Sequence, residues 1–173
     1  MIPERYKDAQ WDDIPRNIQD LLWKIPETRR GIYIHGEVGS GKTHIVYAIK
    51  KWWDERAPIR KSVFWNTAEL IREIKLDFDR QPIDKKRIEE GMIGEDKQPL
   101  LFLDDIGAEK MTDFVAETFY LIINDRYIHV RPVIYTSNLS IEELADRVGD
   151  RIASRIAESC DIINLKGGDR RIQ

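Results

Sequence analysis

Residues 36–43 read Gly36-Glu37-Val38-Gly39-Ser40-Gly41-Lys42-Thr43, and this stretch decides the fold. Glycine at positions 36, 39 and 41, followed by Lys-Thr, is the pattern of a phosphate-binding loop. A short run of β-forming residues precedes it at 31–35, and the stretch that follows has no proline before Pro58. We therefore expect a strand, a loop and a helix in that order.

The loop residues predict the chemistry of a nucleoside triphosphate site. Glycines allow consecutive backbone N–H groups to turn inward around a phosphate, and the helix that follows adds its partial positive charge. We expect Lys42 to reach the β- and γ-phosphates and the Thr43 hydroxyl to bind Mg²⁺. His44 follows directly and joins residues 36–43 in the expected ATP/ADP site. A glycine-rich turn without a ligand is the alternative, but a lysine buried there would need an anion.

Length and composition indicate one soluble α/β domain. The chain has 173 residues, of which 34% are charged and 42% hydrophobic, and its net charge of -3 argues against strong salt-driven DNA binding by a lone subunit. The single cysteine, Cys160, is expected to be a small buried apolar residue. No zinc-site spacing, signal peptide or membrane-spanning run is present, so we expect a cytoplasmic protein without a structural metal or membrane contact.

Strand-like runs alternate with helical stretches along the chain. The expected strands are 31–35, 62–66, 99–104, 131–136 and 160–165. This alternation is typical of a parallel sheet with helices on both faces. We expect one helix to start near Thr67, which would cap it, and another to start at Thr112. Residues 80–98 are read as a short helix and a loop.

Asp104 and Asp105 directly follow an apolar run at residues 99–103. A strand buried on both faces delivers such acids to the sheet edge where the phosphate loop also lies. Asp104 would then hold the Mg²⁺ shell, and Asp105 would orient and polarise the attacking water. A capping role before a turn is the alternative for Asp105.

Polar residues further along complete the candidate site. Asn138 ends the strand-like run at 132–138 and could bind the γ-phosphate or the water, or could simply be a turn or cap residue. Arg151 and Arg155 lie four residues apart, on one helical face. An arginine that contacts the γ-phosphate bound to a neighbouring subunit stabilises transition-state charge. The alternative role for these two arginines is a surface salt bridge to Asp150 or Glu158.

The chain resembles the AAA+ family, and within it the DnaC-type helicase loaders and the IstB-type transposition helper ATPases. The resemblance is carried by residues 36–43, by Leu-Asp-Asp-Ile-Gly-Ala-Glu-Lys at 103–110, by Ile-Ile-Asn-Asp-Arg-Tyr at 122–127, by Thr-Ser-Asn-Leu-Ser at 136–140, by Arg-Ile-Ala-Ser-Arg-Ile at 151–156, and by Gly-Gly-Asp-Arg-Arg at 167–171.

The resemblance implies a P-loop NTPase three-layer α/β/α sandwich with sheet order 5-1-4-3-2. It implies that Asn138 is the sensor 1 residue and that Arg155 acts in trans as an arginine finger in an oligomer. It also implies a leader segment at 1–30 whose Tyr6 lines the adenine pocket, followed by an ATPase core at 31–173. The helix after the second strand, around 67–94, takes the place of the element that contacts single-stranded DNA in such proteins.

The chain departs from the family at its ends. Only about thirty residues precede the first core strand, which leaves helicase binding open, and we expect no C-terminal lid domain. Arg170 and Arg171 stand near the end of the chain, where a sensor 2 residue would be, and neither is assigned.

The leading functional hypothesis is an ATP- and Mg²⁺-dependent ATPase that assembles on single-stranded DNA and loads a replicative helicase, with slow hydrolysis stimulated by assembly or DNA. A transposition helper ATPase is the alternative within the family. A small-molecule kinase is a hypothesis from another class, and the acid pair with Asn138 favours water activation over it. A nucleotide-gated scaffold that scarcely hydrolyses ATP, with Asp105 too short to place water well, is a third hypothesis.

Overall fold

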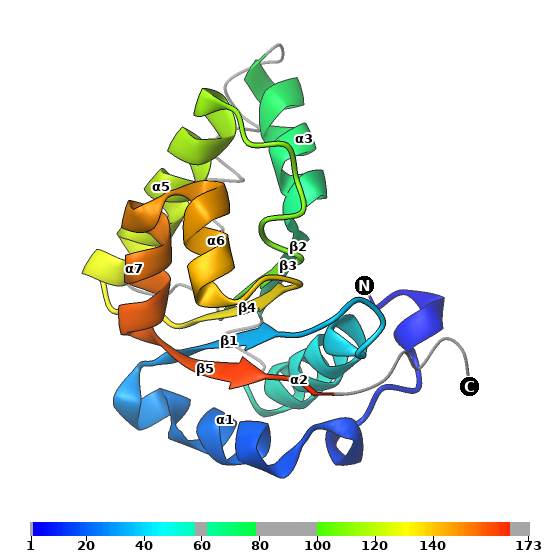
Figure 1. The fold of residues 1–173 in the computed structure, drawn as a ribbon. Coiled ribbons are helices and arrows are strands. Elements are labelled where there is room, and N and C mark those ends of the chain that lie inside the picture. Colours follow the sequence, from blue (N-terminus) through cyan, green and yellow to red (C-terminus); the bar gives the residue numbers. More distant parts are fainter. Residues whose placement is uncertain (1, 58–61, 79–99, 167–173) are drawn as a thin grey trace.

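The computed structural model describes residues 2–57, 62–78 and 100–166. Five strands lie in these ranges: β1 (Gly31–His35), β2 (Val63–Asn66), β3 (Leu101–Asp104), β4 (Val133–Ser137) and β5 (Cys160–Asn164). The helices that the structure describes are α1 (Arg16–Thr28), α2 (Lys42–Arg56), α3 (Thr67–Phe78), α5 (Asp113–Ile128), α6 (Ile141–Val148) and α7 (Asp150–Ser159), preceded by the 3-10 turns η1 (Glu4–Tyr6) and η2 (Trp11–Asp13) (Figure 1). The predicted strands are confirmed: β1 has the predicted ends, and the ends of the others differ by at most two residues, as strand ends commonly do.

The described strands form one parallel sheet in the order β2-β3-β4-β1-β5. This is the predicted order 5-1-4-3-2. In register, Ile32 pairs with Ile134 of β4 and with Asp161 of β5, so β1 lies between these two strands. All four pairings are parallel, and the carboxyl ends of the strands therefore share one edge.

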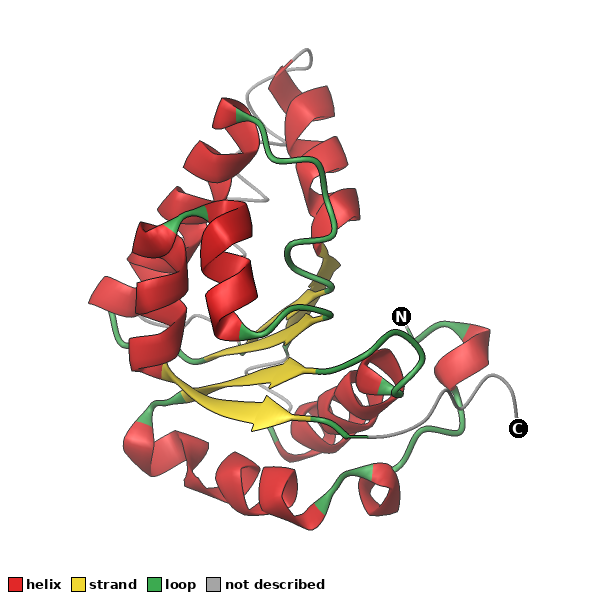
Figure 2. Ribbon diagram, in the orientation of Figure 1, coloured by secondary structure: helices red, strands yellow, loops and turns green. Residues whose placement is uncertain are grey.

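Alternating side chains divide the core into two layers, one on each face of the sheet. Tyr33, Leu103 and Tyr135 point into the layer covered by α3, α5, α6 and α7. Ile34 and Phe102 point into the opposite layer, covered by α1 and α2. Figure 2 shows the yellow sheet between these two sets of red helices, which is the predicted three-layer sandwich.

The helix starts show which short-range predictions were right. The Thr112 hydroxyl accepts a hydrogen bond from the Val115 N–H and caps α5, as predicted. The prediction that Thr67 caps α3 is wrong. The Asn66 side chain accepts from the Ala68 and Glu69 N–H groups, so Asn66 provides the cap and leaves the Thr67 hydroxyl to a contact outside the helix.

The first thirty residues contain a helix that the sequence reading did not single out. Ile18, Leu22 and Ile25 of α1 are buried against the layer that also contains α2. Their spacing of four and three residues is the helical signal in the sequence that could have revealed it. Cys160, at the start of β5, is 2% exposed, which confirms its prediction as a buried residue. Residues 79–99 and 167–173, which include the predicted short helix, Arg170 and Arg171, lie outside the described ranges.

Candidate nucleotide-binding site

The phosphate-binding loop connects β1 to α2, as the sequence predicted. Gly39 and Gly41 have φ angles of 85° and 92°, in the left-handed region that glycine enters without a steric cost. α2 begins at Lys42, directly after Gly41, so its N-terminal N–H groups and partial positive charge lie at the loop. The loop backbone is thus shaped for an anion.

Lys42 lies folded against this loop. Its ammonium donates hydrogen bonds to the carbonyl oxygens of Gly36 and Glu37, both at 2.8 Å, and the residue is only 7% exposed. A positive charge is therefore held beside the N-terminus of α2 at the carboxyl edge of the sheet. Such an arrangement favours binding of phosphate over binding of a neutral or cationic group.

Thr43 and Asp104 face each other across the base of the site. The Thr43 hydroxyl lies 3.3 Å from both carboxylate oxygens of Asp104, which is 5% exposed at the end of β3. Burial raises the pKa of the Asp104 carboxyl above its ordinary value, and the nearby charge of Asp105 adds to this effect. Hydrogen bonds from Thr136 and Thr43 and the charge of Lys42 act in the opposite direction. A divalent cation at these oxygens would offset the cost of keeping the carboxylate ionised.

Asp105 is fixed through both its backbone and its side chain. Its φ angle is 65°, a conformation that aspartate and asparagine tolerate better than most residues. Its N–H donates to the Thr136 hydroxyl at 2.8 Å, and its carbonyl accepts from the Thr67 hydroxyl at 2.9 Å. The Asn138 amide donates to the Asp105 carboxylate at 3.1 Å. The structure therefore brings Asp105 and Asn138 together, as the sequence predicted for one sheet edge.

These groups line a cavity of about 540 Å³ at the carboxyl edge of the sheet. The predicted residues that line it are Tyr6, Val38, Gly39, Gly41, Lys42, Thr43, His44, Asp104, Asp105 and Asn138. Gly36, Glu37 and Ser40 shape the loop without lining this cavity.

Tyr6 and His44 form one wall of the cavity. The Tyr6 ring stacks on Tyr47 of α2 with ring centres 4.6 Å apart, and the His44 ring contacts the Tyr6 ring edge-on at 6.4 Å. His44 also pairs with Asp13 of η2 at 2.9 Å. The N-terminal turns are thereby attached to α2, and an aromatic surface lies beside the phosphate loop.

Three residues that the sequence reading did not assign to the site also line the cavity: Arg5, Asn66 and Thr136. Asn66 and Thr136 lie at the carboxyl ends of β2 and β4, the same positional signal that identified Asp104 and Asn138. Thr136 contacts both acids, because its hydroxyl donates to Asp104 at 2.6 Å and accepts from the Asp105 N–H. Position at the carboxyl end of a predicted strand could have identified both residues from sequence.

Arg155 lies away from this cavity. It is on α7, whose last residue, Ser159, leads directly into the start of β5, so this end of α7 lies at the opposite edge of the sheet (Figure 1). Within the described residues, neither Arg151 nor Arg155 forms an ion pair with Asp150 or Glu158. Arg155 instead donates to Asn124 of α5 at 2.9 Å. The chain's own cavity therefore contains Lys42, Asp104, Asp105 and Asn138 without Arg155.

A nucleotide and Mg²⁺ fit the groups that line the cavity. Backbone N–H groups and Lys42 suit phosphate, and the hydroxyl of Thr43 with the carboxylate of Asp104 are hard oxygen donors of the kind that Mg²⁺ prefers. In the ranges that the structure describes, no group of three or more His, Cys, Asp or Glu side chains could hold a metal by itself. This donor set fits Mg²⁺, which commonly takes one or two carboxylates and completes its shell with phosphate and water.

A phosphate-binding loop after β1, paired acids at the end of β3 and this strand order define a P-loop NTPase of the AAA+ type. The order separates this class from P-loop folds whose loop-bearing strand has other neighbours. The chain belongs to the family described as IstB-like ATP binding protein, which it matches over residues 8–173.

Similar proteins include helicase loaders. The replicative helicase loader DnaI of Bacillus subtilis (strain 168) is 32% identical over 132 residues, which cover 75% of this chain and 40% of DnaI. The uncharacterized protein YqaM of the same organism is 29% identical over 174 residues, which cover 97% of this chain and 52% of YqaM. A crystal structure of the DnaC helicase loader superposes with a TM-score of 0.81 at 27% identity, and covers 95% of this chain and 100% of that one.

The chain thus spans about half the length of these curated relatives. None of the described helices has the length and apolar character that crossing a membrane requires.

Proposed function

We propose that this protein is an ATP- and Mg²⁺-dependent ATPase that acts in DNA replication as an oligomer whose active sites form between copies. One observation carries the proposal. The chain gathers Lys42, Thr43, Asp104, Asp105 and Asn138 around one cavity, while Arg155 lies at the opposite edge of the sheet. A site that needs all six residues is completed only when a second copy provides the arginine.

Each residue has a role that follows from its position. Lys42 and the loop N–H groups bind the phosphates, and the aromatic wall of Tyr6 and His44 is placed to contact the base. Thr43 and Asp104 would hold Mg²⁺, which supplies neutralisation of phosphate charge when bound. Asp105 accepts a proton from the attacking water. As it does so, the water oxygen bonds to the γ-phosphorus and the bond to the departing ADP oxygen breaks. Asn138, which already contacts Asp105, orients the water or the γ-phosphate.

The two acids differ in a way that suits these roles. Asp104 is buried and receives hydrogen bonds, so it can act as a fixed ligand, whereas Asp105, one residue further along the chain, is more accessible. A general base has to approach the reacting water, and Asp105 meets that requirement.

The arginine in trans explains why hydrolysis would depend on assembly. The guanidinium of Arg155 would stabilise the charge on the transferring phosphoryl group of the neighbouring copy, an effect worth a factor of about 10³–10⁵ in rate. Hydrolysis by a dilute chain is then slow, and self-association or assembly on DNA increases it.

Loading of a replicative helicase onto single-stranded DNA is the role that we propose for this ATPase. Its support is the similarity to DnaI and DnaC, which are helicase loaders. A transposition helper is the second candidate, because the chain belongs to the IstB-like family. The net charge of -3 argues against strong salt-driven DNA binding by a lone chain.

The test is hydrolysis as a function of protein concentration, with and without single-stranded DNA. Arg155→Ala should abolish DNA-stimulated hydrolysis and leave ATP binding by calorimetry unchanged, and EDTA should stop hydrolysis by the unsubstituted protein. Arg151→Ala is the matched control, because it removes an exposed arginine from the same helix. Unchanged hydrolysis by Arg155→Ala at every concentration would exclude an arginine in trans. Co-purification of a helicase or of a transposase from the native host distinguishes the two candidate roles.

A further inference from the structure

One sequence motif has no part in the cavity. Residues 122–127 read Ile-Ile-Asn-Asp-Arg-Tyr and lie on α5, on the face of the sheet opposite α2. Ile122 and Ile123 are buried in that core layer, which explains the apolar pair. Asn124 is partly exposed, and its side-chain oxygen faces α7 instead of the core.

Asn124 contacts the guanidinium of Arg155 directly. The Nε of Arg155 donates to Oδ1 of Asn124 at 2.9 Å, and Nη1 donates to the carbonyl of Arg151, one turn earlier in α7, at 2.9 Å. The two acceptors lie on different helices, so together they fix both the direction and the rotation of the planar guanidinium. An arginine side chain has five N–H donors, and these two bonds leave three for another ligand.

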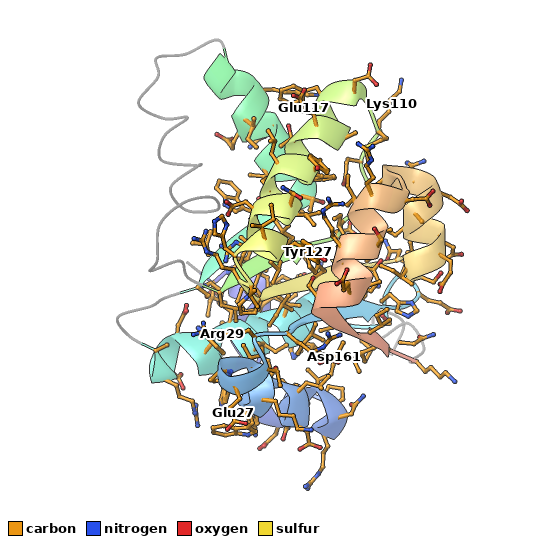
Figure 3. All side chains as sticks on the ribbon, turned by 90° about the vertical axis from the view of Figure 1, so that its left-hand side faces the viewer. Glu27, Arg29, Lys110, Glu117, Tyr127 and Asp161 are labelled. Atoms are coloured by element: carbon orange, nitrogen blue, oxygen red, sulfur yellow. The ribbon has the colours of Figure 1, made fainter. Side chains whose placement is uncertain are left out.

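Two tyrosine rings complete this arrangement. The guanidinium carbon lies 5.1 Å from the ring centre of Tyr120 and 5.6 Å from that of Tyr127, both on α5. These distances are typical of cation–π contacts. The Tyr127 hydroxyl is in turn hydrogen-bonded to the Glu158 carboxylate of α7, which raises the pKa of Tyr127. Figure 3 shows Tyr127 on the side of the molecule where α5 and α7 lie together.

An amide suits this position better than a carboxylate would. A free arginine side chain loses about 2 kcal/mol of rotamer entropy when it is fixed, and a chain that fixes it before assembly removes that cost from the reaction. A neutral acceptor does this without neutralising the positive charge that phosphate requires. An aspartate at 124 would hold the guanidinium as firmly but would cancel most of its charge.

We propose that Asn124, supported by the rings of Tyr120 and Tyr127, is a positioning residue that pre-organises Arg155 for the γ-phosphate of a neighbouring copy. Asn124 does not line the nucleotide cavity, and it acts only through Arg155. The inference rests on the proposed role of Arg155 in trans, and it assigns a function to the motif at 122–127.

The experiment uses mixed assemblies of two variants. Asp105→Asn chains lack the water-activating acid but present a native Arg155, whereas Asn124→Ala chains have a native cavity and a misplaced arginine. We expect Asn124→Ala alone to lower kcat at least tenfold without changing the affinity for a fluorescent ATP analogue. Addition of Asp105→Asn chains should restore hydrolysis, as it should for Arg155→Ala, and the double variant Asn124→Ala/Arg155→Ala should be no slower than Arg155→Ala.

Two further variants separate positioning from stability. Asn124→Asp keeps the size and the acceptor, so it should fold normally, and it should still lower kcat because the carboxylate neutralises the guanidinium. Asp125→Asn, at the next residue, weakens the ion pair with Arg131 and leaves the contacts of Arg155 in place. It should lower the melting temperature without a kcat defect that mixing can restore.

The outcomes distinguish the two proposals. If Asp105→Asn chains do not restore hydrolysis to Arg155→Ala chains, the role of Arg155 in trans is wrong, and this inference fails with it. If they restore Arg155→Ala but Asn124→Ala and Asn124→Asp retain full kcat, or lose it in a way that mixing does not restore, Asn124 has no positioning role while the proposed function stands.

Discussion

Replacement of Thr136 by valine removes the one hydroxyl that connects the two acids of the site. Thr136 is 1% exposed on β4, and its hydroxyl donates to Asp104 at 2.6 Å while accepting from the Asp105 N–H at 2.8 Å. Valine has nearly the same shape, so the packing of β4 between β3 and β1 should be preserved. The change isolates the two hydrogen bonds.

The expected cost follows from these contacts. A hydrogen bond to a charged acceptor contributes about 1.5–3 kcal/mol, and a buried N–H left without an acceptor costs about 1–3 kcal/mol. Because the Asp104 carboxyl can relax or take up a proton, we expect a loss near the low end of the sum, about 3 kcal/mol. With a urea dependence of about 2 kcal/mol per molar, the midpoint should fall by about 1.5 M.

The assay is urea unfolding followed by tryptophan fluorescence, with Thr118→Val as the matched control. Thr118 is 9% exposed, and its hydroxyl donates only to the Phe114 carbonyl of its own helix at 2.7 Å, a group that already accepts a helical bond. The control should lose less than about 1 kcal/mol. Equal midpoints for the two variants would refute the assigned importance of Thr136.

The difference between these variants should also depend on pH. Burial raises the pKa of Asp104, so the folded state takes up this proton more readily than the unfolded state does. The stability linked to that proton is present at pH values below the unfolded pKa and is lost as pH rises through the folded pKa. The Thr136 hydroxyl acts against this rise, because it donates to the ionised carboxylate and so lowers the Asp104 pKa. Since valine cannot donate, the Thr136→Val penalty should be largest near neutral pH, where Asp104 is ionised, and should shrink in acid. A penalty that grows as pH falls would contradict this sign.

Two further predictions concern the hydroxyl of Thr67 and the thiol of Cys160. Thr67→Val removes the hydroxyl 2.9 Å from the Asp105 carbonyl, and should lower kcat about tenfold with little change in ATP affinity, as measured by steady-state hydrolysis and calorimetry. Unchanged kcat would show that the Asp105 backbone does not need this support. Burial raises the pKa of Cys160 to about 12, so the folded thiol should resist Ellman's reagent at pH 8, and stability should fall as pH rises above the unfolded value of about 9. Rapid modification of the folded protein would contradict the burial of Cys160.

Much of the nucleotide site could be read from sequence because its members are held by short-range geometry. Residues 36–43 specify their own loop, since glycine spacing and the following helix act within eight positions. Asp104 and Asn138 could be placed because parallel strands deliver their last residues to one edge, whatever the details of packing. Lys42 and Thr43 then face that edge without further information.

Contacts between distant segments could not be read in this way. Thr67 at the start of a helix has the composition of a cap, but its hydroxyl contacts Asp105, 38 positions away, because β2 pairs with β3. The role of Thr136 likewise depends on the pairing of β3 with β4. A hydroxyl can serve several acceptors, and only the fold decides which one lies within reach.

The sequence by itself determined a parallel α/β sheet, its phosphate-binding loop and the acids at its edge, because periodicity and glycine geometry are local properties of the chain. Only the tertiary structure decided where Arg155 lies. Its spacing from Arg151 fits a salt bridge as well as a catalytic role, and the packing of α5 against α7 placed it on Asn124 and two tyrosine rings, at the edge opposite its own cavity. That separation is a property of the assembled layers, which residue order alone does not specify.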